Sequence, residues 1–333
     1  MIQARMQSES PDRRTESMSI TLQCPSCCRD LGKIPSDNSL HLNALPTCPR
    51  CSFWIRNEHG IWMALTPERE QRYRKFMKDY ERIRSLEGRG SADAEYYLAL
   101  PFRDLTGANA SQWRIRSRTY QCFRERILPG LEAKHGRMRI LDIGAGNCWL
   151  SYRLASRGHH PVAVDLLVND ADGLGAAHHY AGRLALCFPR FQAEMDRLPF
   201  AESQFDCAIF NASFHYSEDY YWTLNEVIRC LRPGGTVIIA DSPWYRRAES
   251  GEEMLRERRS IFEKKFGTPS DSISSREYLT DDLLRALEKR LAIKWCIYHP
   301  SYGVRWALRP LIARLRGKRE PSRFRIYAAE VQK

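Results

Sequence analysis

Four cysteines near the N-terminus have a spacing that suits a metal ion. Cys24, Cys27, Cys48 and Cys51 form two C-x2-C pairs separated by twenty residues. A two-residue gap lets both sulfurs of a pair reach one tetrahedral ion, and two pairs complete a four-thiolate zinc site. A redox dithiol is the alternative for a single pair, but it does not explain two matched copies. We therefore expect structural zinc here, with the neighbouring Cys28 as a bystander.

A second group of residues could bind a nucleotide-like ligand. The stretch ILDIGAGNCWL carries Gly144 and Gly146, which allow a tight turn and the close approach of a ligand. A dinucleotide-binding loop has a third glycine where this chain has Trp149. Asp142 just before the glycines would repel a pyrophosphate, whereas it suits a positively charged group such as an amino acid's ammonium.

The next predicted strand ends in another carboxylate. Asp165 closes the stretch VAVDL, where a carboxylate can accept hydrogen bonds from both hydroxyls of a ribose. A ligand with a ribose, an amino-acid tail and no phosphate is S-adenosylmethionine. The glycines and the two carboxylates together predict this molecule as the cofactor.

Strands and helices in alternation must position these residues. Expected strands cover 139–143, 161–164, 187–193, 205–211, 236–240, 292–298 and 324–331. Several of these are short apolar runs, as in strands that are buried on both faces. The alternation predicts a doubly wound α/β sheet, in which ligands bind beyond the carboxyl ends of the strands.

At this point the chain resembles the class I S-adenosylmethionine-dependent methyltransferases. The stretches AEMDRLPFAESQFDCAIFNASFHY and NEVIRCLRPGGTVIIADS follow the glycine loop in the family's order and at its usual spacing. The resemblance covers about residues 138–242. It implies a seven-stranded Rossmann-like methyltransferase sheet of order 3-2-1-4-5-7-6 with the seventh strand antiparallel.

The resemblance also implies contacts to the cofactor. Glu194 stands where an acid reads the adenine amino group, and Asp196 is the alternative because the family usually has aspartate. Met195 would lie against the ring, and Asn211 near the methionine end. The expected cofactor-binding residues are Asp142, Gly144, Ala145, Gly146, Asp165, Leu166, Glu194, Met195 and Asn211.

The sequence contains fewer motifs that point to the residues around the methyl acceptor. Methyl transfer depends mainly on positioning, and it needs a base only where the acceptor holds a proton of high pKa. The motif places His215 near the methyl group as a candidate general base, with a packing or substrate-shaping role as the alternative. Aromatic side chains expected at the acceptor, or else in the core, are Tyr96, Tyr97, Tyr216 and Tyr220.

The chain divides into four expected parts. They are a disordered leader (1–21), a cysteine module (22–65), linking helices that cover the active site (66–130) and a methyltransferase core (131–333). The core contains an insert (242–290) and a basic segment (305–325). The cysteine module resembles the small zinc-ribbon proteins that partner RNA and protein methyltransferases.

The distribution of charge along the sequence is compatible with several kinds of partner. The net charge is +12, and the segment 305–325 holds eight basic residues against one acid. Such a segment could contact RNA, an anionic membrane, or a phosphorylated or lipid-linked substrate. The scattered cysteines suit a reducing cytosol, and no apolar run is long enough to span a membrane.

Three functions remain at this stage. Methylation of a small-molecule or lipid-linked acceptor in a covered pocket is favoured by the inserts. Methylation of rRNA or tRNA is the alternative, because a zinc module and a basic tail suit RNA. A non-catalytic partner or scaffold with a vestigial core is the third, and the intact glycine loop argues against it.

Overall fold

A computed structural model describes residues 19–35, 45, 47–184 and 187–332. The strands are β1 (Ser19–Gln23), β2 (Asp30–Pro35), β3 (Arg56–Glu58), β4 (Ile61–Met63), β5 (Arg139–Ile143), β6 (His160–Asp165), β7 (Arg190–Gln192), β8 (Phe205–Asn211), β9 (Leu231–Ala240), β10 (Cys296–Tyr298) and β11 (Ile326–Glu330). The α-helices are α1 (Pro67–Leu86), α2 (Ala94–Ala99), α3 (Ala110–Arg126), α4 (Leu128–His135), α5 (Trp149–Ala155), α6 (Tyr220–Cys230), α7 (Ala248–Phe266), α8 (Asp281–Leu291), α9 (Val304–Ala307) and α10 (Arg309–Leu315). Two 3-10 helices, η2 (Leu174–Tyr180) and η3 (Phe214–Tyr216), join them.

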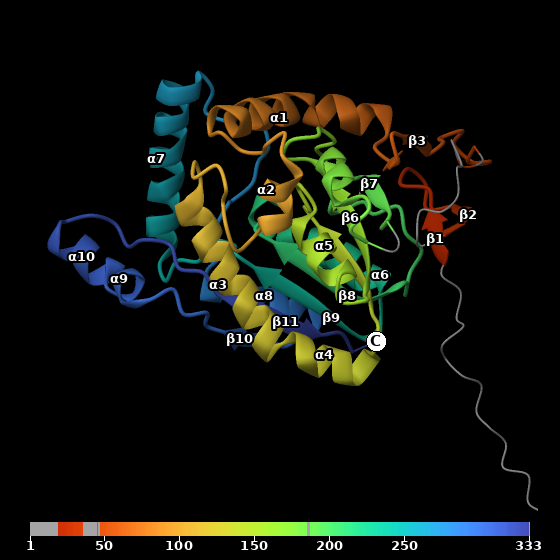
Figure 1. Cartoon of the computed structure of the whole chain (residues 1–333). Coiled ribbons are helices and arrows are strands. Elements are labelled where there is room, and N and C mark those ends of the chain that lie inside the picture. The colour runs from red at the N-terminus through yellow and green to blue at the C-terminus, as the bar shows by residue number, and fades with distance from the viewer. Residues whose placement is uncertain (1–18, 36–44, 46, 185–186, 333) are drawn as a thin grey trace, which may run out of the picture.

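One large sheet of nine strands organises the molecule (Figure 1), in the order β10-β11-β9-β8-β5-β6-β7-β4-β3. The strands β5 to β11 follow the predicted relative order, and β11 is antiparallel to β9 and β10. The sheet is wider than the predicted seven strands, because β4 adds to the edge of β7 in parallel and β3 pairs with β4 in antiparallel. The cysteine module therefore extends the main sheet.

The predicted strand bounds agree best with those of the structure where the sequence has a continuous apolar run. β5 and β8 have the predicted bounds, and β8 is buried along almost its whole length. β10 covers less than the predicted 292–298, because Ala292 ends α8 in a left-handed conformation with φ of 52°. β7 is likewise shorter than the predicted 187–193.

The part of the chain that the structure describes begins before the end of the expected leader (1–21). β1 starts at Ser19, inside the expected leader, and residues 1–18 lie outside the described part of the chain. Ile20 and Leu22 are fully buried, which accounts for the order of this strand. The amide of Gln23 also donates to the carbonyl of Pro199 at 3.1 Å, so β1 is hydrogen-bonded to the core domain.

Helices cover both faces of the sheet and its carboxyl edge. α1 lies across the top of the molecule in Figure 1, next to α7 from the insert. Pro67 starts α1, and Asp281 starts α8 after its N-cap Thr280. The additional helix α4 ends at His135, inside the region assigned to the core. No helix in the described residues is long and apolar enough to cross a membrane.

The cysteine module shares a hydrophobic core with the sheet. Ile20, Leu31 and Ile55 belong to one cluster of buried side chains together with Phe200 and Leu141. The opposite face of the sheet packs against α2, α3, α4 and α5 in a second cluster. The N-terminal module is thus joined to the core by apolar packing as well as by β4.

Candidate functional site

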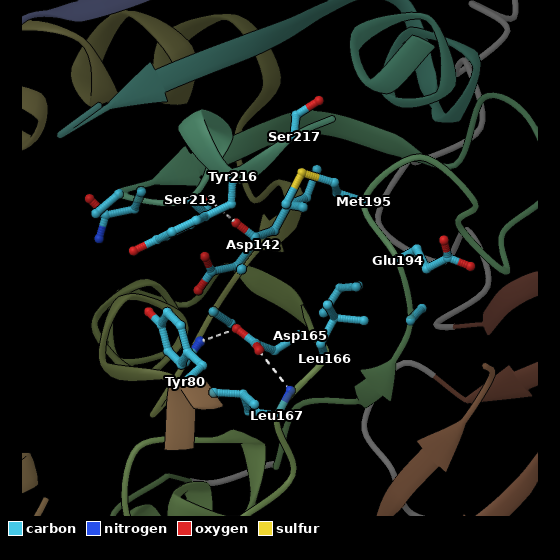
Figure 2. Close-up of a pocket in the computed structure, with 18 of the residues that line it drawn as sticks. Tyr80, Asp142, Asp165, Leu166, Leu167, Glu194, Met195, Ser213, Tyr216 and Ser217 are labelled. Carbon is cyan, nitrogen blue, oxygen red and sulfur yellow. Dashed lines mark hydrogen bonds between the residues drawn. The ribbon is translucent and has the colours of Figure 1, made fainter. Parts of the chain in front are cut away.

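A cavity opens where the carboxyl ends of β5, β6, β7 and β8 meet, and we call it the main cavity (Figure 2). This is where ligands bind in doubly wound sheets. All nine residues predicted to contact the cofactor line it: Asp142, Gly144, Ala145, Gly146, Asp165, Leu166, Glu194, Met195 and Asn211. The structure therefore brings the predicted set together.

The glycine loop after β5 has no room for a side chain at Gly144. Gly144 has φ of 70°, and a Cβ there would lie 2.2 Å from the Cβ of Ser213. Trp149 opens α5 and is buried edge-on against Trp113 and Tyr120. The third glycine of a dinucleotide loop is replaced here by a side chain that anchors α3 to the loop.

Asp142 presents an unsatisfied carboxylate oxygen. Its Oδ2 accepts a hydrogen bond from Ser151 Oγ at 2.7 Å. Its Oδ1 is buried and has no hydrogen-bond partner in the described part of the chain. Burial raises the pKa of this carboxyl to about 7. An unpaired buried oxygen at the wall of a cavity fits a cationic group of a ligand.

Asp165 is held by the backbone on both sides. Its Oδ2 accepts from the amide of Gly146 and its Oδ1 from the amide of Leu167, each at 2.8 Å. Burial raises the pKa of Asp165 to about 6. Each carboxylate oxygen keeps a lone pair, so the fixed group fits the two hydroxyls of a ribose.

Glu194 has a partner that the sequence did not reveal. Arg69 of α1 donates from Nε to both carboxylate oxygens at 2.8 Å, and its Nη2 contacts Oε2 as well. Figure 2 shows the Glu194 carboxylate turned away from Asp142 and Asp165. The side chain therefore ties α1 to the cavity wall, and the alternative acid, Asp196, lines the same cavity.

A second cavity of about 410 Å³ adjoins the main cavity. The residues that line both are Phe76, Tyr80, Arg84, Arg116, Ala212, Tyr216 and Ile273. Its wall comes from α1, from α3 and from the insert that contains α7, and the loops after β8 and β9 complete it. Its size is within the range of small-molecule sites.

His215 lies in the second cavity but is a poor proton acceptor. Its Nδ1 is 3.4 Å from Ser242 Oγ, and the side chain is buried. Burial first, and then Arg258, Arg116 and Arg84, lower the pKa of His215 to about 3. The imidazole is neutral at physiological pH and its low basicity does not suit the predicted role of general base.

Other ionisable groups of the second cavity were not predicted. Asp241 follows β9; its Oδ1 accepts from Thr119 Oγ1, and its buried Oδ2 has no partner among the described residues. Burial raises its pKa to about 6. Burial also raises the pKa of Glu277, which pairs with Arg258, to about 7. In the sequence, the position of Asp241 directly after the expected strand 236–240, in the stretch TVIIADS, is the feature that could have indicated it.

The predicted tyrosines divide into two groups. Tyr216 lines both cavities, as expected for the acceptor site. The structure brings Tyr96, Tyr97 and Tyr220 to neither cavity. The hydroxyl of Tyr97 donates to the carbonyl of Ala171 at 2.8 Å, and that of Tyr220 donates to the carbonyl of Tyr278 at 3.2 Å. Tyr96 is buried against Tyr97 with ring centroids 4.9 Å apart, so all three tyrosines contribute to packing.

The four predicted cysteines converge. The sulfurs of Cys24, Cys27, Cys48 and Cys51 all lie within 4.8 Å of one another, with Cys24 and Cys51 at 3.4 Å. Four thiolates around a tetrahedral zinc ion at about 2.3 Å would be about 3.8 Å apart. The four thiols therefore fit such an ion, and Cys28 is exposed and lies outside the group.

Residues 141–239 match the family model of a methyltransferase domain. The chain therefore contains a methyltransferase domain over these residues. The matched region of this methyltransferase domain includes the glycine loop, Asp165 and Glu194, but not the cysteine module or the helices α1 to α4.

Curated relatives are similar over about a third of this chain. A malonyl-[acyl-carrier protein] O-methyltransferase of Erwinia pyrifoliae is 29% identical over 103 residues, which are 31% of this chain and 37% of the relative. A demethylmenaquinone methyltransferase of a Mycobacterium species is 30% identical over 103 residues, or 31% of this chain and 41% of the relative. The chain spans about two fifths of the length of these relatives.

Solved structures are similar over a larger part of the chain. A magnesium protoporphyrin IX methyltransferase from Synechocystis with bound SAH has 15% identity and a TM-score of 0.46, covering 79% of this chain and 98% of the other. The YcgJ protein of Bacillus subtilis has 16% identity and a TM-score of 0.44, covering 62% and 97%.

Proposed function

We propose that this protein transfers a methyl group from S-adenosylmethionine to a small-molecule or lipid-linked acceptor in the second cavity. The observation that supports the proposal is the shared wall between the main cavity and the second cavity, because a donor bound in the first would lie beside an acceptor bound in the second. Transfer between two bound molecules depends on such positioning.

The main cavity fits the donor through its own residues. The free Oδ1 of Asp142 suits the ammonium group of the methionine moiety, and the oxygens of Asp165 suit the ribose. Asp196 or Glu194 would face the adenine, with Met195 against the ring. The bound donor would supply an electrophilic methyl group, and the protein would orient it towards the second cavity.

The second cavity suits an amphipathic acceptor. Its apolar lining comes from residues such as Ile83, Ile115, Met254 and Phe262. Arg116 also lines it and makes no ion pair or hydrogen bond within the described ranges, although it lies 4.8 Å from the Trp113 ring. The named relatives, which include enzymes for malonyl-[acyl-carrier protein] and demethylmenaquinone, favour a small or lipid-like acceptor.

The acceptor's proton, where it has one, would pass to Asp241. Its Oδ2 is unpaired in the second cavity, and a carboxyl whose pKa is about 6 can accept a proton near neutral pH. His215, with a pKa of about 3, would shape the cavity as a neutral group. An acceptor that is already anionic needs no base.

We also infer that the four-cysteine group holds one structural zinc ion. The cluster offers four sulfur ligands and no position for a substrate, so the metal would stabilise the module without taking part in the reaction. The zinc-ribbon resemblance of residues 22–65 supports the same inference.

The test measures donor binding and methyl transfer separately. Calorimetry should show binding of S-adenosylmethionine to the full chain. Labelled methyl groups should then be transferred to a component of a metabolite or lipid extract. Transfer to stripped tRNA or rRNA alone would support the RNA alternative. A failure to bind the donor would leave the non-catalytic alternative.

A further inference from the structure

The segment between β10 and β11 projects from the molecule. It contains α9 and α10, which we call the α9–α10 arm, and Figure 1 shows the arm standing away from the sheet on the side opposite the cysteine module. Neither helix contains a buried residue. The arm therefore exposes most of its side chains.

Large aliphatic side chains are concentrated on the arm. The exposed ones, with their exposed fractions, are Val304 (76%), Leu308 (45%), Leu311 (55%), Ile312 (41%) and Leu315 (78%). Five such residues in a twelve-residue stretch form a patch, whereas the others in the described chain are scattered over many elements. Contiguous apolar surface of this kind marks an interaction site.

Unpaired cations surround the patch. Arg305, Arg314, Arg316 and Lys318 are exposed, and none has an acidic partner in the described parts of the chain. The single acid of the segment, Glu320, is already paired with Arg323 at 3.2 Å. The arm thus combines a net positive charge with aliphatic side chains that point into solvent.

We propose that the α9–α10 arm is a peripheral anchor for an anionic lipid bilayer. Aliphatic side chains enter the boundary between headgroups and acyl chains, and arginine and lysine bind the negative headgroups. A surface that bound RNA through phosphates would need the cations but not the exposed leucines. The combination favours a bilayer over a nucleic acid.

The base of the arm adjoins the second cavity. Trp306 stacks on Phe324 with ring centroids 5.7 Å apart, and Phe324 lines the second cavity. The hydroxyls of Tyr302 and Thr119 lie 2.8 Å apart, and Thr119 donates to Asp241. An arm seated on a bilayer would hold this cavity close to lipid-soluble acceptors, a step that rests on the proposed function.

Vesicle sedimentation tests the anchor on the full chain. Vesicles of phosphatidylcholine with about a third phosphatidylglycerol should bind the protein roughly tenfold or more better than pure phosphatidylcholine. Leu311→Glu with Leu315→Glu should reduce binding by roughly tenfold or more. Replacing Arg314, Arg316 and Lys318 by glutamine should remove the preference for the anionic lipid.

A matched control uses aliphatic residues of similar exposure elsewhere. Leu86→Glu with Ile261→Glu, at 57% and 56% exposure on α1 and α7, should bind vesicles like the unchanged protein. Thermal melts of every variant establish that each is folded. Equal binding of both lipids, or equal loss in both double variants, overturns the proposal.

Two further readouts separate the alternatives. If the arm double variant abolishes self-association in ultracentrifugation while vesicles never bind, the patch covers a second copy and the bilayer proposal is wrong. Affinity for S-adenosylmethionine is measured on the same samples. Vesicle binding without donor binding would support the anchor and refute the proposed function. Donor binding without vesicle binding would refute the anchor and support the proposed function.

Discussion

Asp142 is the residue on which the donor site most depends. The carboxyl is almost fully buried, and one oxygen lacks a partner among the residues described. Because its pKa is raised to about 7, the Asp142 carboxyl is mainly protonated below that pH when no ligand is bound. A cationic ligand group would stabilise the ionised form, so ligand binding and proton release are linked.

Donor affinity should therefore weaken as the pH falls. Below about pH 7 the proton must leave Asp142 before the ammonium binds, so affinity should drop by up to about tenfold per pH unit. Asp142→Asn should weaken binding by about 10- to 100-fold at pH 8 and reduce the pH dependence. Calorimetry from pH 6 to 8 measures both effects. Asp206→Asn is the control and should keep the pH dependence. Asp206 lies at the start of β8, at the opposite end of that strand from the main cavity.

His215 and Asp241 should differ in their effect on the pH profile of the reaction. His215→Gln should leave the profile between pH 5.5 and 8 unchanged, because the imidazole with a pKa of about 3 does not titrate there. Asp241→Asn should remove an ionisation near pH 6. Initial rates with the acceptor that the labelled-extract experiment identifies measure this. A profile that changes only in the His215 variant would restore histidine as the base.

Among the elements, α1 is attached to the main cavity by a buried ion pair. Arg69 and Glu194 have side-chain exposures of 18% and 4%, and the pair joins a helix outside the matched domain to the end of β7. Removal of one partner from such a pair leaves an uncompensated charge. This contact therefore contributes to holding α1 over the main cavity.

Arg69→Met should lower the free energy of unfolding by about 3 kcal/mol and weaken donor binding. Lys75→Met on the same helix removes an exposed pair with Asp79 and should cost less than about 0.5 kcal/mol. Urea unfolding measures both. The double change Arg69→Met with Glu194→Met should recover most of the loss, and equal effects of the two single changes would contradict this account.

Sequence patterns predicted those elements whose signal is local. β8 and the glycine loop follow from a continuous apolar run and from glycines at fixed spacing, and the four cysteines follow from their spacing. Arg69, Arg116 and Asp241 were missed, because their roles arise from contacts between segments far apart in the chain. For Tyr96 and Tyr97 the sequence left the acceptor site and core packing as alternatives, and the structure buries both side chains.

At the scale of the whole molecule, the cysteine module and the sheet form one hydrophobic unit. Ile20 and Ile55 share a core with Phe200, and β4 pairs directly with β7. A change at the metal site should therefore affect the stability of the entire protein.

Purified protein should contain about one zinc ion per chain, as measured by elemental analysis. Cys48→Ser should lose the metal and lower the melting temperature of one cooperative transition, because the shared core unfolds with the module. Cys28→Ser, adjacent to the cluster but outside it, should retain both metal and stability. Two separate transitions in the Cys48 variant would show that the module unfolds independently.

The pairing of β4 with β7 also bears on how the chain folds during its synthesis. Trp62 pairs with Phe191, so the N-terminal module leaves the ribosome long before its partner strand exists. Contacts of such high sequence separation form slowly, because the intervening chain must first be closed into a loop. Until β7 is synthesised, β4 lacks its parallel partner and keeps an unpaired strand edge. If the four cysteines bind zinc as proposed, they can do so in that interval, because all four lie before β4 in the chain.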